Sequence, residues 1–95
     1  MEEQVKKVKK FIEDNKLDFS GSGSELNGNC VILAGFICYV IESDGLGWKE
    51  GNELISELDL NFDAEVELTR VFDFAWTNSY EKFWKTPAAK EQYVF

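Results

Sequence analysis

The chain has no histidine and only two cysteines among its 95 residues. Histidine is the commonest general base, the usual activator of a serine or cysteine nucleophile, and a frequent ligand of transition metals. Its absence excludes Ser/His/Asp and Cys/His catalytic sites. We therefore predict that the protein is not an enzyme and uses no metal and no other cofactor.

Phosphate-binding loops are also lacking. The glycines do not have the spacing of a Walker or dinucleotide-binding fingerprint, and Gly45, Gly47 and Gly51 are not followed by lysine and a hydroxyl residue. One loop, Glu42 to Glu53, partly matches an EF-hand calcium loop, with acids at positions one, three, nine and twelve and glycine at six. Its fifth position is Leu46, which offers no side-chain oxygen, so an acidic turn is the alternative that we favour.

The two cysteines lie inside the longest apolar run, residues 30–41. On a strand, Cys30 and Cys38 would be too far apart for a disulfide, so we predict buried free thiols, which are typical of a reducing compartment. The run is shorter than the roughly 20 residues that a membrane-spanning helix needs. No apolar segment resembling a signal peptide follows Met1. These features predict a cytoplasmic protein without membrane contact.

Negative charge dominates the middle of the chain. The net charge is −8, and residues 42–73 hold ten acidic side chains against only Lys49 and Arg70. Affinity for nucleic acid comes from cationic side chains, so direct nucleic-acid binding by this region is not expected. A basic partner protein is the natural counterpart of such a surface.

Hydrophobic periodicity predicts the first elements. Residues 2–15 place Val5, Val8, Phe11 and Ile12 on one stripe, which indicates an amphipathic helix. A Gly/Ser/Asn-rich loop is expected over 19–29. The apolar run 30–41 favours a central strand, with a buried helix as the alternative. Residues 43–52 are expected to form a hairpin-type connection.

Residues 58–76 alternate between apolar and polar side chains, which indicates two antiparallel strands with a break near 61–64. Asn78 is then expected to cap a short helix that ends before Pro87. The prediction is a single α+β domain over residues 1–95, with an N-terminal amphipathic helix, a small antiparallel sheet of about three strands and a short C-terminal helix. An all-α helical bundle is the alternative, because Leu68, Val71, Phe72 and Ala75 also share a helical stripe.

On the predicted sheet the carboxylates form a row on the solvent face, about 6.6 Å apart along each strand. To a basic groove on another protein, such a row would present a charge repeat similar to that of a nucleic-acid strand. The alternative is a polar face that only contacts solvent, which is common in antiparallel sheets. Trp48 lies in the preceding glycine-rich turn, where it would serve either as a binding anchor or as a lid on the sheet. The predicted partner-binding residues are Glu57, Asp59, Asp63, Glu65, Glu67 and Trp48.

These features predict a small acidic, non-enzymatic protein that binds and inhibits a basic, nucleic-acid-handling partner. Small anti-defence proteins of phages and plasmids, and toxin immunity proteins, have this general profile. The likeness is one of type and not of motif. The alternative is a structural module that self-associates, for example as a homodimer, through a strand edge or the Trp48 loop.

Overall fold

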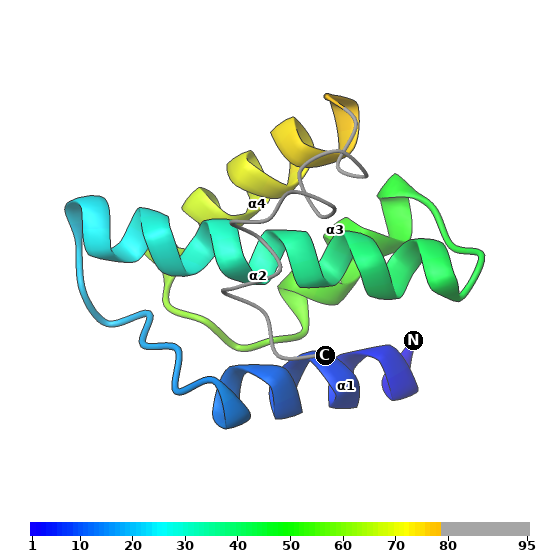
Figure 1. The fold of residues 1–95 in the computed structure, drawn as a ribbon, viewed down its shortest axis with the longest axis horizontal. Helices are drawn as coiled ribbons and strands as arrows, with labels where there is room; N and C mark the ends of the chain where they lie inside the picture. The colour runs from blue at the N-terminus through cyan, green and yellow to red at the C-terminus, as the bar shows by residue number, and fades with distance from the viewer. Residues whose placement is uncertain (79–95) are drawn as a thin grey trace.

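The computed structural model describes residues 1–78, which form four helices joined by short connections (Figure 1). The predicted C-terminal helix after Asn78 lies outside the described residues. The helices, in chain order, are α1 (Glu2–Asp14), α2 (Gly23–Ser43), α3 (Trp48–Ser56) and α4 (Phe62–Thr77).

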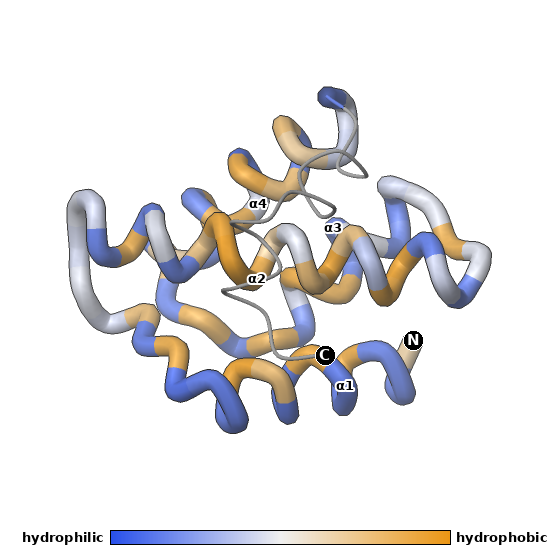
Figure 2. The backbone as a smooth tube through the Cα atoms, in the orientation of Figure 1, coloured by the Kyte–Doolittle hydropathy of each residue, from blue (hydrophilic) through white to orange (hydrophobic). Residues whose placement is uncertain are grey.

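Helix α2 is the centre of the bundle. It packs against each of the other three helices, and in the view of Figure 1 it runs between α1 on one side and α4 on the other. Apolar residues gather along the middle of α2 and on the side of α1 that faces it (Figure 2). A helix that is apolar on all sides must be enclosed, and the other helices provide the enclosure. The largest fully buried side chains include Leu33, Ile37, Ile41, Leu54, Leu68 and Phe72.

The α+β prediction is wrong, because residues 1–78 contain helices and no strand or sheet. The all-α alternative describes this part of the chain. Residues 30–41, predicted as a strand, belong to α2. Their β-branched side chains favour strands on local preference, but burial against three helices outweighs that preference.

The alternating segment 58–76 is also helical over most of its length. The predicted break near residue 61 is the start of α4, where the Asn61 side chain accepts a hydrogen bond from the Ala64 N–H at 2.9 Å. Ala64, Leu68 and Phe72, each four residues apart, are fully buried. Their spacing is that of one helix face, and it competes with the period-two pattern over the same residues.

The predicted helix at the N-terminus is confirmed, with bounds one residue shorter than expected. Two predicted loops are shorter than expected, because α2 already begins at Gly23 and α3 at Trp48. The α2–α3 connection is therefore a four-residue turn in which Gly45 has a φ of +70°. The Glu50 carboxylate accepts a hydrogen bond from the Gly47 N–H at 3.1 Å, as in half of a capping box.

The thiols of Cys30 and Cys38 are both free and buried, as predicted. They lie on α2, which at 21 residues is long and apolar enough to cross a bilayer by length and composition alone. Half of its most apolar stretch is buried inside the bundle. The core helix of a folded domain has the same properties, so α2 is accounted for by its place in the fold.

Candidate partner-binding surface

The side of α4 that faces away from the bundle carries large apolar side chains. Phe62, Val66 and Phe74 are 79%, 52% and 65% exposed. Asp63 and Asp73 are exposed on the same side of the helix. On a helix with about 100° between residues, these five side chains lie within roughly a third of the circumference. We call this set, Phe62, Asp63, Val66, Asp73 and Phe74, the α4 outer face.

The predicted even row of carboxylates is not formed. Glu65 and Glu67, two residues apart, would share a face on a strand, but on α4 they lie about 200° apart around the axis and so on opposite flanks. Glu57 and Asp59 belong to the connection before α4, and both are exposed. Asp63 is the one residue of the predicted row that lies on the α4 outer face.

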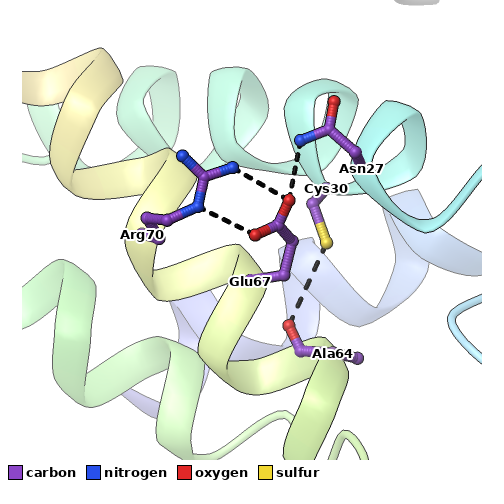
Figure 3. A network of polar contacts seen from close by, with 5 residues as sticks. All are labelled: Asn27, Cys30, Ala64, Glu67 and Arg70. Carbon is purple, nitrogen blue, oxygen red and sulfur yellow. Dashed lines mark hydrogen bonds and ion pairs between the residues drawn. The ribbon is translucent and has the colours of Figure 1, made fainter. Parts of the chain in front are cut away.

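Glu67 is hydrogen-bonded to other side chains of the protein (Figure 3). Its carboxylate accepts two hydrogen bonds from the Arg70 guanidinium, both at 2.9 Å, and one from the Asn27 amide at 2.7 Å. Since Asn27 is on α2, the network ties α4 to the central helix. The hydrogen bonds from Arg70 and then Asn27 lower the pKa of Glu67 to about 2. Glu67 therefore has a structural role, and Arg70 does not add a free cation to the surface.

Trp48 is the first residue of α3 and is 47% exposed. Its indole N–H donates a hydrogen bond to the Asp73 carboxylate at 2.8 Å. This contact joins the start of α3 to the second half of α4 and places the indole beside the α4 outer face. The prediction that Trp48 forms a lid on a sheet is wrong, because residues 1–78 contain no sheet, and its role as a binding anchor stays a prediction.

Sequence reasoning missed the three exposed apolar residues of α4. The alternating pattern assigned Phe62, Val66 and Phe74 to the core, together with Ala64, Leu68 and Phe72. A helical reading of the same segment separates the two sets, because both are spaced by multiples of four residues and the offset of two residues between them places them on opposite sides of the helix. The capping asparagine before the segment was the signal that favoured this reading.

Two carboxylates of the loop that partly matches an EF-hand, Asp44 and Glu50, are used in contacts within the bundle. Asp44 accepts a hydrogen bond from the Gln4 amide at 3.0 Å and lies 3.5 Å from the Lys7 ammonium. Glu50 caps α3, as described above. Within residues 1–78, no group of three or more acidic or cysteine side chains is placed to hold a metal ion. The geometry of this segment is that of a helix–turn–helix junction and not of a calcium loop.

Two of the surface hollows among the described residues lie beside α1 and beside the second half of α4. One, of about 320 Å³, is between α1 and α2, and its charged residues include Lys10, which pairs with Asp14 at 2.9 Å. The other, of about 170 Å³, lies beside Phe74 and has an apolar lining that includes Val71 and Ala75. Neither brings together a nucleophile and a base in the part of the chain described.

Comparison with protein-family models, with curated proteins and with solved structures gives no match to this chain.

Proposed function

We propose that this protein acts by binding a basic partner protein, without catalysis, and that the α4 outer face is the contact surface. The observation that supports this is the exposure of Phe62, Val66 and Phe74 among carboxylates on one helix. Clustered apolar side chains on a surface mark interaction sites, and aromatic residues are enriched there. Single exposed apolar side chains scattered over the surface would not indicate a binding site, because they are common in soluble proteins.

Electrostatics favours a cationic partner. Residues 42–73 carry all of the chain's net charge, and Asp59, Asp63 and Asp73 are exposed on or beside α4. Long-range attraction would speed association with a basic protein and repel acidic ones. Proteins that bind nucleic acid are one class with such a surface, and inhibition would follow where the contact covers their binding site. The support for a basic partner is the excess of negative charge on and beside α4. It is not an even row of carboxylates, because α4 does not form one.

Capture of partners by matched variants tests the proposal. The test variant neutralises Asp63 of the α4 outer face and the two exposed carboxylates of the connection before α4: Glu57→Gln, Asp59→Asn and Asp63→Asn. The control removes the same charge from exposed positions of α1: Glu2→Gln, Glu3→Gln and Glu13→Gln. Each bait is used to capture proteins from a lysate, and a captured basic protein is then purified and its affinity for each variant measured.

We expect the purified partner to bind the wild type and the α1 control alike, and to bind the α4 variant about tenfold more weakly. The affinity for the wild type should fall as salt rises, because screening weakens exposed charge pairs. Thermal unfolding of each variant checks that the bundle is intact. Equal affinity for both variants, or a partner that is not basic, would overturn the proposal.

A further inference from the structure

The shape of the α4 outer face limits what can bind it. Phe62 and Phe74 are twelve residues apart, so the α4 outer face is roughly 18 Å long, at 1.5 Å per residue, with the exposed Arg70 between Val66 and Phe74. It lies on the convex surface of a helix whose backbone groups are hydrogen-bonded within the helix. An extended peptide gains affinity by pairing its main chain with a strand edge, and the described residues offer none here. The binding partner must therefore satisfy its own backbone and contact α4 through side chains.

A helix meets this requirement. Its apolar side chains would pack against Phe62, Val66 and Phe74 over about three turns, as helices pack in bundles. The carboxylates of Asp63 and Asp73 lie among these residues, near the two ends of the stripe. They would face the flanks of the bound helix, where lysine or arginine would pair with them. The Arg70 guanidinium is turned toward Glu67, so that pair adds no net charge to the contact.

A second copy of this chain fits the face poorly. A symmetric contact presents the same residues on both sides. An antiparallel arrangement that sets Phe62 against Phe74 of the other copy also sets Asp63 against Asp73 of that copy. A parallel two-fold arrangement sets each aspartate close to its own equivalent. Either arrangement brings like charges together at the rim of the contact, and both chains carry net negative charge.

We infer that the α4 outer face binds an amphipathic helix of the partner, with an apolar stripe about three turns long flanked by lysine or arginine. This inference rests on the proposed function and specifies the structure that the partner presents. It requires both parts of the face: the apolar side chains for contact area, and the carboxylates for choice of partner.

Model peptides test the inference directly. The probe is a fluorescein-labelled peptide of about 18 residues with leucines at helical spacing (i, i+4, i+7, i+11) and lysines on both flanks. One control peptide has the same composition in scrambled order, and a second replaces each lysine by glutamate. Binding is measured by fluorescence anisotropy, and backbone amide shifts in NMR spectra locate the contact.

Two protein variants complete the design. Phe62→Ser with Val66→Ser removes the apolar area, whereas Phe62→Leu with Val66→Ile keeps it; both pairs change exposed residues, so the fold is retained. We expect the amphipathic lysine peptide to bind the wild type and the conservative variant at least tenfold more tightly than the serine variant. The scrambled and glutamate peptides should bind the wild type at least tenfold more weakly than the amphipathic lysine peptide does. The amide shifts caused by the lysine peptide should map to residues 62–74.

Equal binding of the scrambled peptide, equal binding by the serine variant, or shifts that map to α1 would overturn the helix inference. These results would leave the proposed function standing if the partner still binds the variant Glu57→Gln, Asp59→Asn and Asp63→Asn more weakly than the α1 control. The proposed function itself is overturned if the partner binds these two variants with equal affinity. Dimerisation of the wild type that the serine variant abolishes would assign the face to a second copy and overturn the inference.

Discussion

Gly51 of α3 lies directly against the ring of Phe72 of α4. A β-carbon built on Gly51 would come 2.7 Å from Cε2 of the ring and closer still to Cζ. Phe72 is fully buried, so its ring cannot move aside without disturbing the core. The absence of a side chain at Gly51 is therefore what permits α3 and α4 to approach at this point.

Gly51→Ala should destabilise the protein, although alanine has the higher helix propensity. We expect the free energy of unfolding to fall by about 1–3 kcal/mol, the usual cost of overpacking a core. Gly28→Ala is the matched control, because Gly28 is also helical and a β-carbon there meets nothing within 4 Å. That change should stabilise by about 0.5–1 kcal/mol. Urea denaturation measures both, and a stabilising Gly51→Ala would refute the close approach.

The Glu67 network should make stability depend on pH. The folded-state pKa of about 2 is below the ordinary value of 4.5, so the contribution of Glu67 is complete above about pH 5. It is lost progressively as the pH falls from about 5 through 2, because the carboxyl group becomes protonated first in the unfolded state and then in the folded state. Glu67→Gln should cost about 1 kcal/mol at pH 7 and little at pH 2.

Denaturation series at several pH values measure this difference. Glu53→Gln serves as the control, because Glu53 is exposed on α3 and removing its charge should leave the pH dependence near that of the wild type. A gap between the wild type and Glu67→Gln that stays constant from pH 7 to pH 2 would show that the carboxylate is not the source of the effect.

Lys16 has a left-handed backbone, with a φ of 52°, just after the end of α1. Glycine adopts this conformation without the steric cost of a β-carbon and is the preferred residue at such helix ends. Lys16→Gly should therefore raise the free energy of unfolding by about 0.5–1 kcal/mol. Lys16→Ala removes the same charge but keeps a β-carbon, so it should give no gain. Equal effects of the two changes would attribute the result to charge.

Cys30 and Cys38 should report on unfolding. Burial raises the pKa of the Cys30 thiol to about 11 and that of Cys38 to about 12, so little thiolate is present at pH 8. We expect neither to react with a thiol reagent such as DTNB in the native protein, and both to react in urea. The rate of labelling should rise in Gly51→Ala, because labelling requires opening of the bundle. Fast labelling of the native wild type would contradict the burial of α2.

The sequence predicts α1 well, because Val8 and Phe11 lie on an unambiguous helical stripe. It predicts α2 poorly for a physical reason: this helix packs against three others and carries apolar side chains on all sides, so its periodicity is weak and β-branched residues then favour a strand. Over α4, Phe62 and Val66 complete a period-two pattern although they face solvent. They belong to the surface that we propose for binding, and exposed apolar residues at such surfaces mislead an interpretation that assigns every apolar residue to the core.

Composition predicts the excess of negative charge without any assumption about the fold, whereas the choice of Glu57, Asp59, Asp63, Glu65 and Glu67 as one row rests on the predicted sheet. The arrangement of these residues depends on the fold. Glu65 and Glu67 are two positions apart, a spacing that gives one face on a strand and opposite flanks on a helix. The pairing of Glu67 with Asn27, forty positions away, required the tertiary structure, because no local pattern links the two.

The position of α1 at the edge of the bundle has a consequence for how the protein opens. Helices α3 and α4 contact each other as well as α2, whereas α1 packs mainly on α2, through Val8 and Phe11. A segment held on one side separates at a lower free energy than one held on several, so we expect α1 to unfold locally before the rest of the bundle. Amide hydrogens of α1 should exchange with solvent ahead of those of α2, and proteolytic cleavage should begin in the connection that joins them.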